Sequence, residues 1–200
     1  QKRMSIMLNW VSFLTYAVIT AITPGPNNIM SMSNGSRKGF RGALPFNFGI
    51  LAGFSIVMLV CTLFCTMVST LIPKIKTPML IAGGLYLLYL AWETFRSSGQ
   101  IEETRTRDGF WYGLLLQFIN PKIYIYCIMS MEAYILPFYQ GQIPALVGFS
   151  ILLALIGFAS TLCWSAFGSA FKRLFSTHAK LVNTSMALLL VYCAVSLFFA

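Results

Sequence analysis

Helix-breaking and polar residues interrupt the first long apolar run of the sequence. Two prolines and a glycine stand within three positions of the segment Thr23-Pro24-Gly25-Pro26-Asn27-Asn28, so a regular helix cannot continue through it. The carbonyl groups released by such a break need partners inside the protein or in a water-filled cavity, because hydrocarbon offers none. The Thr23 hydroxyl and the two asparagine amides could be these partners, or they could bind a polar ligand. Six such residues together favour a binding site over the alternative, a structural kink whose free polar groups are hydrogen-bonded by neighbouring helices.

A second break, Asn120-Pro121-Lys122, lies near the middle of another apolar run. If that helix begins near Gly109, Lys122 lies about 18–20 Å along it, too deep to extend comfortably to either interface. An isolated charge at mid-bilayer costs at least about 2.5–3.5 kcal/mol. We therefore expect Lys122 to face the bundle interior, against carbonyls, an amide or an anionic ligand group. The alternative is a buried lysine, charged or neutral, that only ties the two broken helices together.

Together the two breaks have the chemistry to bind a zwitterion. A helix that restarts after a break points free N–H groups and a partial positive charge toward the gap. Donors of this kind suit a carboxylate, and nearby hydroxyl and amide oxygens can accept from an ammonium group. The predicted substrate-binding residues are Thr23, Pro24, Gly25, Pro26, Asn27, Asn28, Asn120, Pro121 and Lys122.

Glu132 is a candidate for coupling transport to protons, together with Lys122. It follows Lys122 by ten residues, which places it about 15 Å further along a straight helix. That distance excludes a direct ion pair between Glu132 and Lys122. The alternative for Glu132 is a solvated carboxylate at the end of the span.

Six apolar runs must position these residues. The chain has 200 residues, of which 58% are apolar and 10% charged, whereas a soluble domain is roughly 45–50% apolar and 25% charged. We therefore expect an integral membrane protein, and the long unbroken runs favour helices over the alternating strands of a β-barrel. The predicted spans are residues 8–31, 43–72, 78–95, 110–138, 143–171 and 181–199. The hinges between them are residues 34–41, 73–78, 97–108, 140–142 and 172–180.

Six spans form two halves of three, which would enter the membrane from opposite sides. We predict an all-α integral membrane fold of six transmembrane helices, a single transporter domain over residues 1–200 with halves 1–96 and 97–200. The breaks fall in the first helix of each half, helices 1 and 4. Interrupted spans at corresponding positions are typical of the midplane site of a transporter built as an inverted repeat.

The net charge of +9 is an orientation signal in this interpretation, not a sign of nucleic-acid binding. Nine of the 14 Lys and Arg residues fall in or beside the loops 34–41, 96–107 and 172–180, and four fall on the other face. The nine-residue face is expected to be cytoplasmic, with both termini outside. The first run should remain in the mature protein, and residues 1–3, which precede Met4, could be foreign to the native chain.

The remaining reactive residues favour no catalytic or metal site. Cysteine spacing gives no framework, and the sequence has one histidine, so no metal or cofactor is predicted. An enzyme is not expected, because the spans lack aspartate and no glycine-rich phosphate loop follows a strand. The pattern Gly49-x-x-x-Gly53 permits close helix approach. It could serve internal packing or a homodimer, and packing is the better interpretation.

Four segments resemble a known family. The run Ile19–Asn28 resembles the signature of the LysE/RhtB superfamily of amino-acid exporters, and residues 120–122 are similar to its second motif. Residues Tyr89–Trp92 and Leu188–Val195 resemble, more narrowly, the cysteine/O-acetylserine exporter branch. The resemblance extends over residues 10–199. It implies six helices in the bacterial inner membrane, export of small neutral or basic amino acids, and coupling to the proton-motive force.

We therefore predict secondary-active efflux of small amino acids, with cysteine or O-acetylserine preferred, by alternating access. Exporters of threonine, homoserine or leucine share the same core motifs and are an alternative. A non-transporting membrane scaffold and a passive channel are alternatives from other classes. The predicted partners are the amino-acid substrate, protons and the lipid bilayer.

Overall fold

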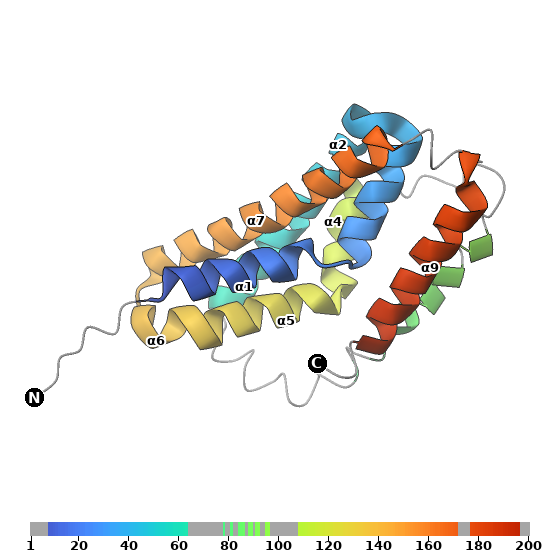
Figure 1. Ribbon diagram of the computed structural model, residues 1–200. Helices are drawn as coiled ribbons and strands as arrows, with labels where there is room; N and C mark the ends of the chain where they lie inside the picture. Colours follow the sequence, from blue (N-terminus) through green and yellow to red (C-terminus); the bar gives the residue numbers. More distant parts are fainter. Residues whose placement is uncertain are drawn as a thin grey trace, which may run out of the picture.

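The computed structural model describes residues 8–63, 78, 81, 84–86, 88–89, 91–92, 95–96, 108–171 and 177–196. All the regular structure in these residues is helical (Figure 1). The helices are α1 (Trp10–Ile22), α2 (Pro26–Leu63), α4 (Phe110–Ile119), α5 (Pro121–Ser130), the π-helix η1 (Met131–Ile135), α6 (Leu136–Tyr139), α7 (Ile143–Ala170) and α9 (Ala179–Ser196). The expected all-helical, apolar architecture is confirmed for this part of the chain.

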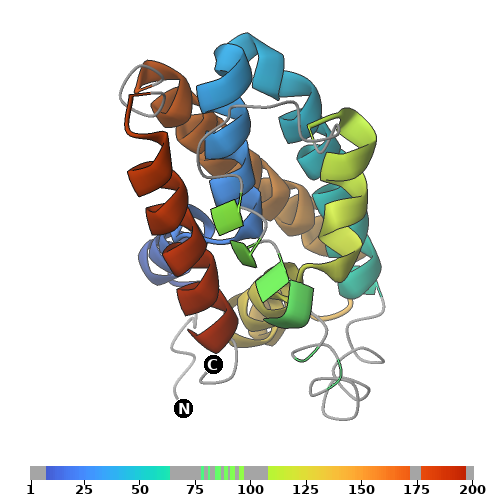
Figure 2. The same cartoon turned by 90° about the vertical axis from the view of Figure 1, so that its right-hand side faces the viewer.

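The first predicted break is present, and the helix that follows it is longer than expected. α1 ends at Ile22, and α2 begins at Pro26, which needs no N–H partner at a helix start. α2 is itself divided at Gly39, whose φ of 75° and ψ of 170° are not helical. The chain turns over there and runs back (Figures 1 and 2). α1 and the first part of α2 thus form one broken helix over residues 10–38.

The predicted hinge at residues 34–41 is therefore confirmed in its place, but it is shorter than expected. Helical structure continues through most of it, and a single glycine makes the turn because it can adopt positive φ without a Cβ clash. Some of the polar residues that suggested a loop form hydrogen bonds with one another within the helix. Ser36 Oγ donates to the Ser33 carbonyl at 2.8 Å, and Arg37 donates to Asn34 Oδ1 at 2.7 Å.

The second predicted break separates α4 from α5, which are bent by 65°. Asn120 lies between them and caps α5, because its Oδ1 accepts from the backbone N–H of Lys122 at 3.1 Å. The helical run then continues through η1 and α6. Nothing in the sequence predicts this π-helical segment.

The last two predicted spans correspond to α7 and α9. α7 begins at Ile143, as expected, after a turn in which Gly141 has a φ of 78°. α9 begins at Ala179, two residues before the predicted start. These two elements differ from the expected runs only at their ends.

The count of six spans is not confirmed. Among the described residues, α2 and α7 are long and apolar enough to cross a membrane, and a third span results if α4 is joined with residues Pro121–Tyr139. α1 and residues Lys180–Val195 are shorter apolar helices. Part of the chain lies outside the described residues: residues 64–77, 97–107 and 172–176 and much of the expected third span. The same holds for three predicted hinges, namely 73–78 except Pro78, and most of 97–108 and of 172–180. The inverted repeat stays a prediction.

Glycines allow the helices to pack with their backbones in contact. On α2, a Cβ at Gly35 would collide with the Ser165 carbonyl of α7, and in the reverse direction a Cβ at Gly168 would collide with the Met32 carbonyl. The pair Gly49 and Gly53 lies against the backbone of α4 in the same way. The preference for internal packing of this glycine pair is confirmed.

Polar bonds among side chains and backbone groups fix the turn and its surroundings. Asn47 is fully buried, and it joins Ser31 on the first part of α2 to Ser165 on α7, both at 2.8 Å. At the Gly39 turn, the Phe40 N–H donates to Ser169 Oγ at 3.1 Å, and Lys38 forms an ion pair with Asp108. The turn of α2, the end of α7 and the start of α9 thus gather at one end of the bundle (Figure 1).

Candidate functional site

The carbonyls released by the first break all accept hydrogen bonds from side chains. Asn28 Nδ2 donates to both the Ala21 and the Thr23 carbonyls at 2.8 Å. The other donors are Ser160 to Ala21 at 2.9 Å, Trp164 to Ile22 at 3.1 Å, Lys122 to Thr23 at 2.8 Å and Cys193 to Pro24 at 3.4 Å. The end of α1 is therefore held by α2, α5, α7 and α9, which is how an unwound segment is satisfied inside a membrane.

Three amide side chains connect the two breaks. Asn27 Nδ2 donates to Gln117 Oε1 at 2.8 Å, and Asn27 Oδ1 accepts from Gln117 Nε2 and Asn120 Nδ2, both at 3.2 Å. Gln117 also donates to the Gly113 carbonyl at 2.7 Å and is fully buried. The start of α2 is thus bonded to the end of α4 and to the residue that caps α5.

Lys122 reaches from the second break to the first. Its ammonium donates to the Thr23 carbonyl at 2.8 Å and to Thr23 Oγ1 at 3.0 Å. The stem passes over Gly25, where a Cβ would lie 3.0 Å from Lys122 Cδ and 3.2 Å from Nζ. The expectation that Lys122 faces the bundle interior is confirmed, and Gly25 leaves room for its side chain.

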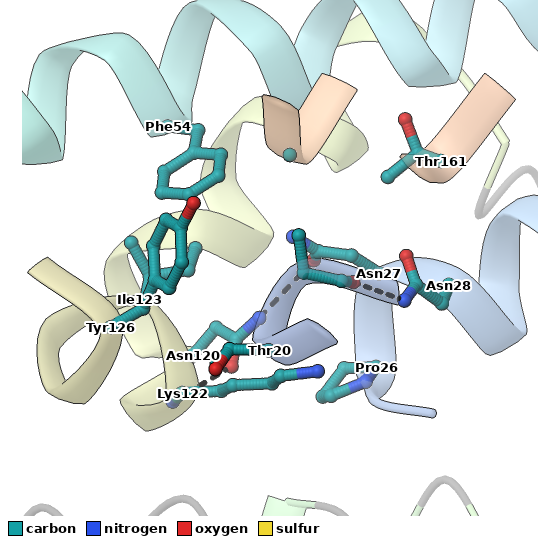
Figure 3. A pocket seen from close by; sticks show the side chains of 12 residues that line it. Thr20, Pro26, Asn27, Asn28, Phe54, Asn120, Lys122, Ile123, Tyr126 and Thr161 are labelled. Atoms are coloured by element: carbon teal, nitrogen blue, oxygen red, sulfur yellow. Dashed lines mark hydrogen bonds between the residues drawn. The ribbon is translucent and has the colours of Figure 1, made fainter. Parts of the chain in front are cut away.

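A cavity lies between these groups (Figure 3). Its polar end is formed by the two breaks, with Asn27, Asn28 and Asn120 beside Lys122. The other end is apolar and carries the rings of Phe54 and Tyr126. The full lining is Thr20, Ala21, Pro26, Asn27, Asn28, Phe54, Asn120, Lys122, Ile123, Tyr126, Gly157 and Thr161.

The cavity is small in this conformation. Its volume is about 40 Å³, which is room for about three water molecules at roughly 10–15 Å³ each. Pockets that hold small organic ligands are larger, about 300–1,000 Å³. A ligand of amino-acid size would therefore enter only if the surrounding helices moved apart.

Five of the nine predicted binding residues line the cavity: Pro26, Asn27, Asn28, Asn120 and Lys122. Thr23 and Gly25 contact the Lys122 side chain, and the Pro24 carbonyl accepts from Cys193. Pro121 is buried at the first position of α5. Both amide hydrogens of Asn28 are used by backbone carbonyls, so this residue holds the break in place.

Glu132 is not part of the cavity. It lies on η1, is exposed and is absent from the lining. Its role in coupling stays a prediction.

Several residues of the site were not predicted. Gln117 was detectable as a polar side chain one turn before Asn120, on an otherwise apolar segment. Thr161 and Gly157 were weaker signals, because small and hydroxyl residues are frequent in membrane helices. Phe54 and Tyr126 carried no signal, since aromatic residues at these spacings look like any packed core.

Comparisons with known proteins agree with the resemblance noted in the sequence. Residues 18–200 match the family described as LysE type translocator. The chain is 40% identical over 189 residues to the cysteine/O-acetylserine efflux proteins of Salmonella paratyphi A and Salmonella typhi, covering 94% of this chain and 96% of theirs. The corresponding protein of Escherichia coli O1:K1 is 38% identical over the same length. No solved structure matches the chain.

Proposed function

Because the chain belongs to the LysE type translocator family, a family of transporters and not enzymes, we propose that it exports small amino acids through the cavity between its two helix breaks. One observation carries the proposal. The Lys122 ammonium, from the second break, binds Thr23 at the first break, on the wall of a cavity that both breaks line.

The polar end of the cavity suits the two charged groups of an amino acid. The Lys122 ammonium and the first-turn N–H groups of α2 are donors for a carboxylate. The hydroxyl oxygens of Thr20 and Thr161 are acceptors for the α-ammonium. When substrate enters, its carboxylate replaces the Thr23 oxygens as the partner of Lys122.

Cysteine and O-acetylserine are the substrates that we propose, since the relatives named above are called efflux proteins for them. The apolar end of the cavity, with Phe54, Ile123 and Gly157, leaves room for a short side chain only. Threonine, homoserine and leucine are the competing substrates.

For the membrane architecture we propose six spans in the bacterial inner membrane, arranged as an inverted repeat of residues 1–96 and 97–200. The two broken helices, α1 with the start of α2 and α4 with α5, are the corresponding elements of the two halves. The basic residues Arg37, Lys38 and Arg41 flank the turn at Gly39, near the end of α7, which favours a cytoplasmic location for that end. Both termini then lie outside.

We also propose proton-coupled alternating access, with Lys122 and Glu132 as the coupling residues. The small volume of the cavity supports alternation, because substrate requires a second conformation in which the walls separate. Glu132 is an exposed carboxylate on η1, outside the cavity, and its part in coupling is a proposal of ours.

A substrate panel in proteoliposomes of known orientation tests the proposal. Saturable efflux of cysteine and O-acetylserine is expected, faster than that of threonine, homoserine and leucine, and accelerated by an imposed pH gradient. Flux that does not saturate and ignores the gradient would indicate a passive channel. No flux of any amino acid, and no ligand-dependent change in melting temperature, would indicate a scaffold.

Replacing Gly25 with Ala is expected to weaken transport and leave the fold intact. The new methyl group would displace the Lys122 stem, which lies 3.0 Å from the Cβ position, and the flexible side chain can move without disturbing the backbone. We expect about a tenfold lower initial rate, the size of effect that follows loss of a charge-assisted hydrogen bond. The measurement is efflux from loaded proteoliposomes together with the melting temperature. A full rate in this variant would mean that the position of Lys122 is unimportant.

A further inference from the structure

The Tyr126 hydroxyl is a buried polar group that has no hydrogen-bond partner among the described residues. The side chain is 3% exposed, and its ring lines the cavity. An unpaired buried hydroxyl is costly, because it has lost its water and gained nothing in return. Such a group in the wall of a binding cavity is a candidate contact for the ligand.

The position of Tyr126 relative to Lys122 limits which ligands can contact both side chains. Tyr126 follows Lys122 by four residues on α5, so the two side chains share one face of the helix, about 6 Å apart along its axis. Lys122 lies at the polar end of the cavity, and Tyr126 lies at the apolar end beside Phe54, with ring centroids 5.8 Å apart (Figure 3). A short amino acid whose carboxylate binds Lys122 would extend its side chain toward Tyr126.

We propose that Tyr126 determines specificity, its hydroxyl forming a hydrogen bond with the hydroxyl, thiol or ester oxygen of the substrate side chain. This inference rests on the proposed function and refines it. An apolar amino acid of equal size leaves the Tyr126 hydroxyl unpaired in the closed site, and a site built to bond a polar group rejects such an analogue strongly. The favoured class is therefore short amino acids with one polar atom on the side chain.

Two residues of the same helix serve as matched controls. Ser130 Oγ is also buried and unpaired among the described residues, yet Ser130 does not line the cavity. Tyr124 also lies outside the cavity lining, and its hydroxyl donates to the Phe118 carbonyl at 3.1 Å. Ser130→Ala controls for the loss of an unpaired hydroxyl, and Tyr124→Phe controls for the loss of a tyrosine hydroxyl from α5.

The test compares efflux of O-acetylserine and cysteine with that of 2-aminobutyrate, an apolar analogue close in size to cysteine. In the wild-type protein, kcat/KM for O-acetylserine should exceed that for 2-aminobutyrate by about tenfold or more. Tyr126→Phe should lower this ratio by about tenfold, chiefly by slowing O-acetylserine efflux, and should not lower the melting temperature. Ser130→Ala and Tyr124→Phe should leave the ratio unchanged.

The outcomes separate this inference from the proposed function. Equal efflux of O-acetylserine and 2-aminobutyrate by the wild-type protein would overturn the role of Tyr126, even if Tyr126→Phe failed to fold. The role of Tyr126 is also overturned if Tyr126→Phe slows the efflux of both substrates equally, changes neither efflux rate, or behaves like Ser130→Ala. Absence of efflux for every amino acid would instead overturn the proposed function itself.

Discussion

Lys122→Met is expected to reduce amino-acid efflux by about 100-fold while leaving the protein folded. Methionine keeps most of the length and packing of the lysine stem but removes the ammonium that donates to Thr23. If that ammonium binds the substrate carboxylate, its loss removes a charge-assisted bond of roughly 3 kcal/mol, and each 1.4 kcal/mol corresponds to about a tenfold change. The measurement is initial efflux from proteoliposomes loaded with O-acetylserine.

The melting temperature distinguishes a binding lysine from a structural one. A charge inside the membrane costs at least about 2.5–3.5 kcal/mol, so a lysine kept for its substrate should give an equal or higher melting temperature when replaced by Met. A lysine that only ties the two breaks together should give a lower one. Lys180 is an exposed lysine at the start of α9, and Lys180→Met is the matched control. It should change neither the efflux rate nor the melting temperature. Normal efflux by Lys122→Met would contradict the assignment.

The two breaks were predictable because their cause is local. Proline removes an N–H and clashes with the preceding turn wherever it stands, so the sequence alone places the interruptions near residues 24–26 and 121. The depth of Lys122 followed from counting residues along the span, and the cost of a buried charge then predicted an inward orientation. These inferences needed no knowledge of neighbouring helices.

The rest of the site depends on which helix faces meet, and a single sequence does not contain that information. Gln117 bonds Asn27 across 90 positions of sequence, and Trp164 caps a carbonyl of α1 from α7. The length of the hinge at residues 34–41 was overestimated for a related reason. Polar side chains such as Arg37 predict a loop, but Arg37 is bonded to Asn34 within a helix that a single glycine ends.

Replacing Gly168 with Ala is expected to destabilise the fold strongly, although it adds only one methyl group. The Cβ would collide with the Met32 carbonyl oxygen and would lie 2.9 Å from its carbon and 3.1 Å from Cα. These atoms belong to the backbone of α2, so no side-chain rotation relieves the clash and the helices must separate. Overpacking of this kind costs typically about 1–3 kcal/mol. A loss at the upper end corresponds to a melting temperature lower by roughly 6–12 °C for a chain of this size.

Gly148→Ala, on the same helix, provides the control for the chemical change alone. Nothing lies within 4 Å of a Cβ at Gly148, and alanine is favoured over glycine in a helix by about 1 kcal/mol. Its melting temperature should therefore stay the same or rise. The difference in melting temperature between the two variants therefore reports on the contact between α2 and α7. The same contact positions Ser160 and Trp164 against the carbonyls of the first break. Equal melting temperatures for Gly168→Ala and Gly148→Ala would contradict the conclusion that close packing of α2 against α7 holds the broken segment in place.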